Sequence, residues 1–219
     1  MNKRNYQKEM DELTGLLMKS GEVPTLLLHS CCAPCSSYCL EYLSKYFRIT
    51  DLFYNPNIFP PEEYERREKE LKRLIEETAE YPNPVTFLAG DYDPKVFFEM
   101  AKGLEDAPER GERCFLCYRL RLTEAARAAK ELGSDYFATT LTLSPLKDAE
   151  KINEIGEEVA KEYGVRYLSS DFKKKNGYLR SLELSKEYDL YRQDFCGCVF
   201  SKKEAEERRK LRERSLSGM

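Results

Sequence analysis

Short apolar runs alternate with amphipathic stretches along this chain of 219 residues. Five runs have the length and composition of buried strands: 25–30, 49–56, 85–90, 135–141 and 165–172. Apolar residues at helical spacing, often bounded by glycine or proline, predict seven helices: 5–19, 36–47, 61–81, 93–103, 114–133, 148–163 and 200–214. Strands that alternate with helices indicate an α/β fold, with a Rossmann-like parallel sheet of about five strands and helices on both faces.

The length favours a single domain over 1–219. We expect a helix within 1–22, an α/β core at 23–170, and a C-terminal extension at 171–219 that closes over the active site. Most of the stretch 173–198 has no clear pattern and is predicted to be irregular. Ser36 or Ser37 is a possible N-cap of the second helix, which would leave the preceding cysteine-rich sequence as a loop.

The charge balance does not by itself indicate a nucleic-acid partner, because the formal net charge is only −3. Basic residues are nevertheless concentrated in 171–214. The longest apolar run, 25–28, is too short to cross a membrane, and polar and charged residues follow Met1. We therefore expect a cytoplasmic protein with no membrane segment.

Eight cysteines in three short motifs are the strongest chemical signal in the sequence. The motifs are HSCCAPCSSYC at 29–39, GERCFLCY at 111–118 and YRQDFCGC at 191–198. Cytoplasmic thiols stay reduced, so such clusters bind metal or perform redox chemistry more often than they form structural disulfides. The first motif directly follows a predicted strand, and parallel α/β sheets bind ligands beyond the carboxyl ends of their strands. The sequence therefore places the active site at this motif.

Four thiolates from two segments are the usual ligands of a [4Fe–4S] cluster. Residues three apart share a helix face, and two adjacent cysteines on an irregular loop can reach one cluster. We predict four ligands of such a cluster: Cys31, Cys32, Cys114 and Cys117. Cys35 is a reserve ligand, and Cys39 is expected to be a buried structural thiol.

The remaining cysteines, Cys196 and Cys198, form a Cys-Gly-Cys motif that favours a redox-active dithiol, with ligation of a second metal as the alternative. His29 is the only histidine and lies in a predicted strand, so we expect a core residue. A hydrolytic zinc site normally uses several histidines and is therefore not expected. The sequence also contains no glycine-rich phosphate-binding motif, so nucleotide binding has no support.

Six motifs resemble those of the epoxyqueuosine reductases of the QueH type, which use no cobalamin. They are HSCCAPCS at 29–36, YNPNIFPPEEYERR at 54–67, GERCFLCYRLRL at 111–122, TTLTLSPLK at 139–147, SSDFKKKNGY at 169–178 and YRQDFCGCVFS at 191–201. The resemblance implies the last step of queuosine formation in tRNA. An epoxide on the cyclopentane ring of the modified wobble base becomes an alkene, with two electrons and two protons removing the oxygen as water.

The resemblance also implies an oxidoreductase that uses an iron–sulfur cluster, with a second iron as an option for the surplus thiolates. Cys196 and Cys198 could supply a two-electron couple beside the cluster. The implied partners are tRNA, recognised through its anticodon loop, and an electron donor that the sequence does not identify.

Proton transfer and RNA binding require further residues. Asp171, Tyr118 and Lys147 lie in the motifs and are candidates for the general acid; a turn residue, a core aromatic and a surface charge are the alternative interpretations. Six residues are candidates for contacts with RNA: Arg113, Lys147, Lys173, Lys174, Tyr178 and Arg192. Four aromatic residues could stack on an extruded base: Tyr54, Phe59, Tyr64 and Tyr178.

Two other functions stay open at the level of sequence. A tRNA sulfur-transfer (thiolation) enzyme could carry a persulfide on the Cys-Gly-Cys motif, although such enzymes normally need ATP. A zinc-stabilised RNA-binding module would use the cysteines for structure only. Iron and sulfide in anaerobically purified protein would argue against the zinc module.

Overall fold

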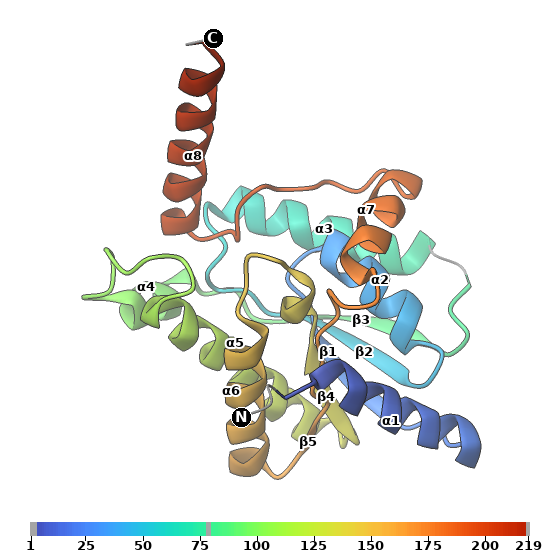
Figure 1. Cartoon of the computed structure of the whole chain (residues 1–219). Helices are drawn as coiled ribbons and strands as arrows, with labels where there is room; N and C mark the ends of the chain where they lie inside the picture. The colour runs from blue at the N-terminus through green and yellow to red at the C-terminus, as the bar shows by residue number, and fades with distance from the viewer. Residues whose placement is uncertain (1–3, 78–79, 218–219) are drawn as a thin grey trace.

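A computed structural model describes residues 4–77 and 80–217 of the chain. A parallel sheet forms its centre (Figure 1), built from five strands: β1 Thr25–His29, β2 Arg48–Phe53, β3 Val85–Ala89, β4 Tyr136–Thr139 and β5 Arg166–Tyr167. The strand order is β3-β2-β1-β4-β5, and every neighbouring pair is parallel. The predicted Rossmann-like parallel sheet is confirmed.

The helices of the described residues are α1 Tyr6–Ser20, α2 Ala33–Leu43, α3 Pro61–Glu77, α4 Pro94–Ala101, α5 Glu112–Glu131, α6 Ala149–Tyr163, α7 Gly177–Glu187 and α8 Val199–Ser217, with a 3₁₀ turn at Thr140–Leu143. The predicted end of α3 at 81 is wrong, since 80–81 are not helical; residues 78–79 lie outside the described part of the chain. Within that part, no helix is both long and apolar enough to span a membrane.

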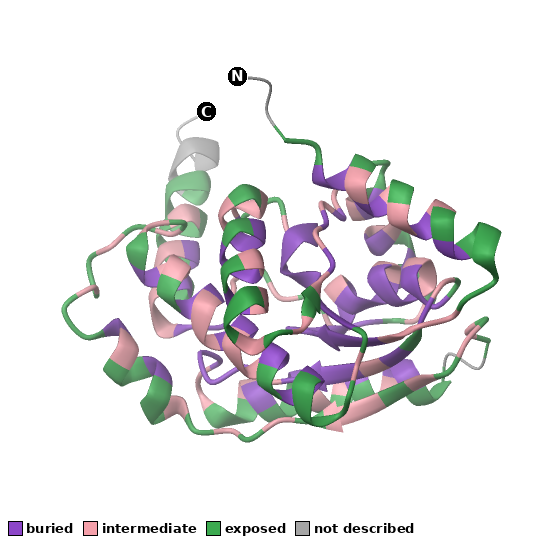
Figure 2. Cartoon of the chain, turned by 90° about the horizontal axis from the view of Figure 1, so that it is seen from below, coloured by how far each residue is buried: buried purple, intermediate pink, exposed green. Residues whose placement is uncertain are grey.

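Both faces of the sheet are covered, because side chains along a strand point alternately to opposite faces. Leu26 and Leu28 of β1 pack in one core with α1, α2 and α3. Leu27 packs in a second core with α5 and α6. Figure 2 shows the buried strands between these layers of helices. Burial on both faces explains why β1 is continuously apolar, as expected for a central parallel strand.

Helix α2 begins three residues earlier than predicted and ends four residues earlier. Cys32 is its N-cap residue, in an extended conformation, and Pro34 occupies the first turn, where the missing N–H is no disadvantage. The prediction of Ser36 or Ser37 as the cap is wrong: both lie inside the helix, and their hydroxyls donate to backbone carbonyls one turn back. Cys35 therefore lies on a rigid helix rather than in a loop.

The C-terminal part of the chain is more regular than predicted. Helix α7 occupies the middle of 173–198, a stretch expected to be irregular, and packs on α2. Gly177 permits this close approach, because a Cβ atom there would lie 2.4 Å from the Tyr38 ring. In contrast, only two residues of the predicted strand 165–172 pair with β4. Helix α7 packs on α2, and the length of β5 depends on its pairing with β4. Both partners are distant in sequence, so local periodicity predicted neither the helix nor the short length of the strand.

Candidate functional site

The loops that follow β1, β2 and β4 meet at the carboxyl end of the sheet (Figure 1). Strand β1 lies between β2 and β4, so the direction in which the chain adds strands reverses at β1. Such a reversal creates the crevice in which α/β proteins bind ligands. Here the sulfur of Cys31, which follows β1, lies 3.9 Å from the hydroxyl of Thr140, which follows β4. The first cysteine motif therefore sits at the ligand-binding edge.

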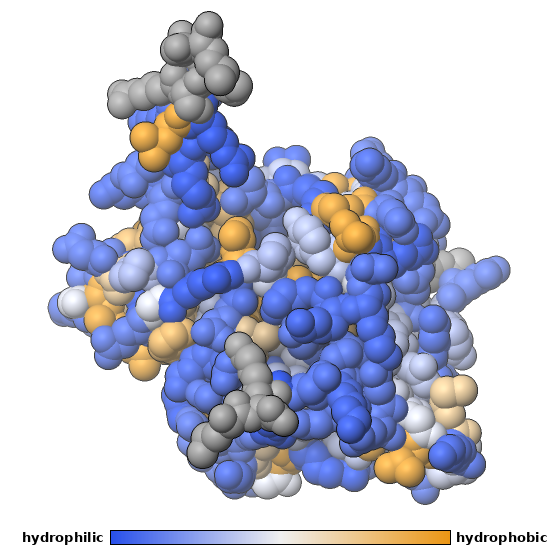
Figure 3. All heavy atoms as spheres, viewed as in Figure 1, coloured by the Kyte–Doolittle hydropathy of each residue, from blue (hydrophilic) through white to orange (hydrophobic). Residues whose placement is uncertain are grey.

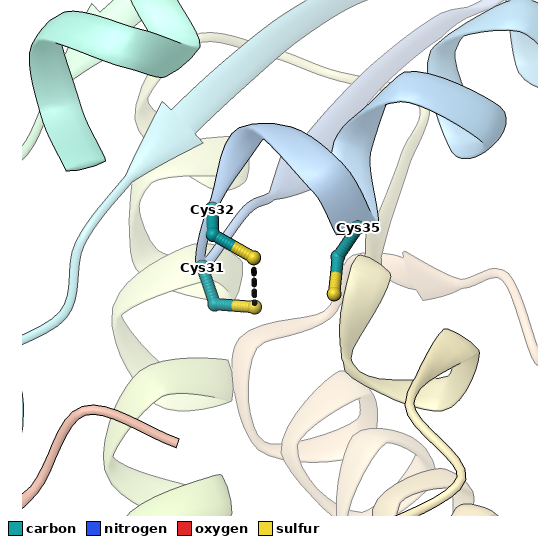
Figure 4. A group of neighbouring side chains, drawn as sticks. All are labelled: Cys31, Cys32 and Cys35. Carbon is teal, nitrogen blue, oxygen red and sulfur yellow. Dashed lines mark hydrogen bonds between the residues drawn. The ribbon is translucent and has the colours of Figure 1, made fainter. Parts of the chain in front are cut away.

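Three cysteines at the start of α2 form what we call the first thiol group: Cys31, Cys32 and Cys35. Their sulfur atoms all lie within 4.8 Å of one another, and the Cys31 and Cys32 sulfurs are 3.8 Å apart. Figure 4 shows the three side chains turned toward a common space beside the first turn of the helix. Cys35, which the sequence predicted only as a reserve ligand, thus lies as close to Cys31 and Cys32 as a metal ligand would.

The three thiols of the first thiol group shift one another's pKa values. Hydrogen bonds from Cys31 and Cys35 hold the pKa of the Cys32 thiol well below its usual value. The hydrogen bond with Cys32 raises the pKa of Cys31, and hydrogen bonds with Cys31 and Cys32 raise the pKa of Cys35. The N-terminus of α2 also favours a thiolate here. Because metals bind thiolates, a metal can take the place of the shared protons.

Four cysteines distant in sequence form the second thiol group: Cys114, Cys117, Cys196 and Cys198. They line one inner cavity, together with Asn57, Arg113 and Arg121. Burial raises the pKa of Cys117 to about 12. Burial also raises the pKa of Cys114 and of Cys198. These thiols therefore hold their protons until a metal or an oxidant removes them.

Lys147 links the two thiol groups. Its Nζ donates a hydrogen bond to the sulfur of Cys196 at 3.2 Å. Both residues line the inner cavity and also a larger cleft of about 270 Å³, whose wall includes the first thiol group. Burial lowers the pKa of Lys147, but the charges of Cys196 and Cys31 raise it by more, so its pKa lies above the usual value and the ammonium form is retained.

The Cys-Gly-Cys loop is held in place by α3. Arg67, 1% exposed, donates from its guanidinium to the carbonyl of Cys196 at 3.0 Å and forms an ion pair with Glu63 at 2.6 Å. The carbonyl of Gly197 accepts from the backbone N–H of Phe59 at 3.0 Å. Gly197 has a φ of +122°, a conformation that favours glycine. These contacts determine where the two sulfurs of the loop lie.

A family model described as epoxyqueuosine reductase QueH matches residues 26–204. The chain belongs to the epoxyqueuosine reductase QueH family. The epoxyqueuosine reductase QueH of Streptococcus pyogenes serotype M1 is 46% identical, covering 92% of this chain and 79% of the relative. That of Staphylococcus epidermidis is also 46% identical, covering 91% and 85%. That of Thermotoga maritima is 34% identical, covering 84% and 93%. The cysteine motifs lie within the matched region.

The three predicted proton donors of this QueH family member occupy different places. Tyr118 is 3% exposed and lines the inner cavity, and burial raises the pKa of its hydroxyl. Asp171 faces an open hollow beside the cleft and forms an ion pair with Lys173 at 3.0 Å. Lys147 alone among the three lines the cleft as well as the inner cavity.

The residues predicted to contact RNA are divided between two surfaces that adjoin at Lys147. Two line the cleft: Tyr178 and Arg192. Two line the open hollow: Lys173 and Lys174. Arg113 is 2% exposed and donates to two backbone carbonyls, so its guanidinium is committed to the protein interior.

Several other predicted residues are part of the core. Both ring nitrogens of His29 are hydrogen-bonded, to the Thr139 hydroxyl and to a backbone carbonyl, and burial lowers its pKa to about 4. His29 is a core residue, as predicted. Cys39 is fully buried in the hydrophobic core, also as predicted. Tyr64 stacks on Tyr92 with ring centroids 3.9 Å apart, and its side chain is buried.

Three residues of the site did not emerge from the sequence: Asn57, Arg67 and Arg121. Asn57 follows β2 at the carboxyl end of the sheet and belongs to the motif at 54–67, which was an available signal. Arg121 follows Cys114 by seven residues and Cys117 by four, and therefore shares their helix face. The role of Arg67 depends on a contact with a loop 129 positions away, which no local pattern predicts.

Proposed function

We propose that this chain reduces epoxyqueuosine to queuosine in tRNA, as the last step of queuosine formation in the cytoplasm. Membership of the QueH family supports the reaction. The observation that carries the proposal is the convergence of both thiol groups around one buried lysine, in two cavities that share Cys196. A zinc-stabilised module needs one four-thiolate site and does not explain the surplus.

The donor set fits an iron–sulfur centre, because thiolates are the ligands that such clusters prefer and three thiols already lie within 4.8 Å. We propose four ligands of a [4Fe–4S] cluster: Cys31, Cys32, Cys114 and Cys117. The position of Cys35 supports it as a further ligand, which a second iron could use. When bound, the cluster supplies electrons one at a time.

We assign the two-electron couple to Cys196 and Cys198. Oxidation of two thiols to a disulfide releases two electrons and two protons, which matches the requirement for removing the epoxide oxygen. One epoxide and two thiols give one alkene, one water and one disulfide. The electron donor then returns the disulfide to two thiols. Cys196 lines the cleft as well as the inner cavity, so the substrate would meet this sulfur first.

Lys147 is the proposed general acid. Its ammonium group lines the cleft, its hydrogen-bond partner is the sulfur of Cys196, and it is shielded from bulk water. A proton on Nζ is therefore available to the oxygen that leaves the ring. Tyr118, behind it in the inner cavity, is a candidate to restore that proton, and Asp171 is the third candidate, at the adjoining hollow.

The cleft is proposed to take the extruded wobble base. Its volume of about 270 Å³ is close to the lower end of small-molecule sites, which begin at roughly 300 Å³. Tyr178 and Arg192 in its wall suit stacking and hydrogen bonding to a base, and Lys173 and Lys174 in the hollow suit phosphates. Figure 3 shows mainly hydrophilic side chains on this face, with small, separate apolar groups. We propose that the segment 171–219 closes over the site, because it supplies part of the cleft wall.

The decisive experiment is turnover of epoxyqueuosine-containing tRNA by the anaerobically reconstituted full chain with a reductant, with nucleosides analysed by mass spectrometry. We expect loss of one oxygen atom to give queuosine. Cys198→Ser should abolish turnover and keep the cluster, which would separate the redox couple from the ligands. Absence of conversion by a protein with an intact, reducible cluster would overturn the proposed reaction.

Substitution of Lys147 tests the general acid. Lys147→Met should lower turnover by about 10²–10⁴-fold, the usual contribution of general acid catalysis. Lys151→Met is the control, because Lys151 lies on α6 in an exposed ion pair with Glu154. Equal turnover by the Lys147 variant and the control would contradict the assignment.

A further inference from the structure

Three arginines of the described residues are almost completely buried, and one of them lacks a counter-ion. Arg67 is paired with Glu63 at 2.6 Å, and Arg113 lies 3.5 Å from Glu204. Arg121 is equally buried, at 1% exposed, but no carboxylate of the described residues lies within ion-pair distance. An unpaired buried charge is strongly unfavourable, so the inner cavity is built to hold a negative charge.

Two of the three guanidinium nitrogens of Arg121 have no hydrogen-bond partner in the part of the chain that the structure describes. Nε donates to the carbonyl of Cys117 at 3.3 Å, and this hydrogen bond orients the guanidinium group. Both terminal nitrogens are buried and unpartnered. Asn57, 1% exposed on the wall of the same cavity, has an unpartnered side-chain oxygen and nitrogen. Buried polar groups normally have partners, so the two Arg121 nitrogens and the Asn57 nitrogen are free to donate to a ligand that accepts hydrogen bonds.

The groups near Arg121 that can become negatively charged are mainly thiols, which lose their protons when they bind a metal. Burial lowers the pKa of the Arg121 guanidinium, but interactions with Cys117, Cys196 and Cys31, which belong to both thiol groups, raise it above its usual value. Sulfur atoms of thiolate-bound clusters accept hydrogen bonds, and their reduction potentials depend on those bonds and on nearby charge. A cation stabilises the more negative, reduced state more than the oxidised state.

We propose that Arg121 is a positioning residue of the redox centre: its two free N–H₂ groups, assisted by Asn57, bind the sulfur atoms gathered in the inner cavity and raise the reduction potential. This inference rests on the proposed iron–sulfur centre and adds what sets its potential. Lys147 contributes charge nearby, but its ammonium is already bonded to Cys196 and faces the cleft. Arg121 instead faces the enclosed cavity, where its effect is least screened.

The test is a potentiometric titration of the reconstituted full chain, with the reduced cluster followed by electron paramagnetic resonance. Arg121→Met and Arg121→Gln remove the charge, whereas Arg121→Lys keeps it. We expect both neutral variants to contain at least tenfold less reduced cluster, relative to oxidised, at the wild-type midpoint potential, a shift of about 59 mV. The lysine variant should lie between them and the wild type. Arg127→Met is the control, because Arg127 is on the same helix in exposed ion pairs.

Each outcome decides the inference. Loaded neutral variants with the wild-type midpoint overturn it. Folded neutral variants that bind no cluster, with binding retained in Arg121→Lys, support a requirement for the charge. Loss of folded protein in all three variants, judged by circular dichroism, would make Arg121 a framework residue and overturn the proposal. Failure of the wild type itself to bind iron and sulfide would instead reject the proposed iron–sulfur centre.

Discussion

The two thiol groups are built in different ways. The first spans five residues and depends on the end of one strand and the start of one helix. The second joins α5 to a loop in which Cys196 follows Cys117 by 79 positions. The first is therefore a local structure, whereas the second exists only when the C-terminal segment is docked. We expect substitutions far from any cysteine to disturb the second group selectively.

Among variants that compare the structural support of the two thiol groups, the largest effect should come from Cys35→Ser, measured against Cys39→Ala four positions later on the same helix. Cys35 belongs to the first thiol group, whereas Cys39 lies in the hydrophobic core. Loss of the Cys35 thiolate should lower turnover by about 100-fold or more and reduce the iron content, because metal ligation tolerates little change. Cys39→Ala should retain both. Iron content and turnover measure the effect. Equal losses in the two variants would show that the packing of α2, and not the Cys35 thiol, is responsible.

Arg67→Met should disturb the second group from a distance. It removes the hydrogen bond to Cys196 and leaves the mostly buried Glu63 without its cation, which should destabilise the fold by about 3 kcal/mol. Lys69→Met is the matched control, since Lys69 and Glu65 form an exposed pair at the same spacing on α3. Urea unfolding and turnover should both change in the first variant and neither in the second. If Arg67→Met retained wild-type turnover, the hydrogen bond from Arg67 to Cys196 would not be what holds the Cys-Gly-Cys loop in place.

Gly197→Ala tests the loop itself. Alanine would be strained at a φ of +122°, and its Cβ would lie 2.8 Å from a side-chain carbon of Ile58, so we expect a cost of about 1–3 kcal/mol. Gly103→Ala also has a positive φ but meets no atom within 4 Å, and isolates the backbone contribution. Turnover should fall in Gly197→Ala alone. Because the first thiol group is formed by residues close in sequence, its three sulfur atoms should remain close together in Gly197→Ala. Cross-linking with a thiol-reactive bridging reagent can check this.

A pH-dependent effect on stability concerns Asp51, which lies beneath the first thiol group. Asp51 on β2 accepts a hydrogen bond from Ser30, which precedes Cys31, and burial raises the pKa of Asp51 to about 8. Between pH about 4 and 8 the folded protein therefore binds one proton more than the unfolded chain. Stability from this group is present at low pH and is lost as pH rises toward 8, by at most about 1.4 kcal/mol per pH unit.

Denaturant unfolding from pH 5 to 8 checks this dependence. Asp51→Asn should flatten the pH profile of the unfolding free energy. Asp135→Asn is the control: hydrogen bonds from Thr25 lower the pKa of Asp135, so its contribution changes only in more acidic solution. An equally steep profile for Asp51→Asn and the wild type would place the titrating group elsewhere.

Prediction from sequence succeeded where the signal is local. The continuous apolar run of β1 and the helical spacing in α5 and α6 identify buried strands and amphipathic helices without knowledge of their neighbours. Helix α7 was missed because its packing surface is defined by α2, which lies far away in the sequence. The start of α2 was misplaced because a serine was preferred as the cap, although Cys32 takes that place.

The sequence by itself determined the order along the chain of the five strands and of every described helix except α7, the α/β class and the concentration of sulfur ligands at the site, because these follow from periodicity and from residue types in short motifs. Only the tertiary structure decided which thiols meet, that Lys147 bonds to Cys196, and that Arg121 is buried with no counter-ion among the described residues. Those relations depend on packing between segments that are distant along the chain. Burial of these side chains then shifts their pKa values and strengthens their electrostatic interactions, because the same side chains in water would be hydrated and screened.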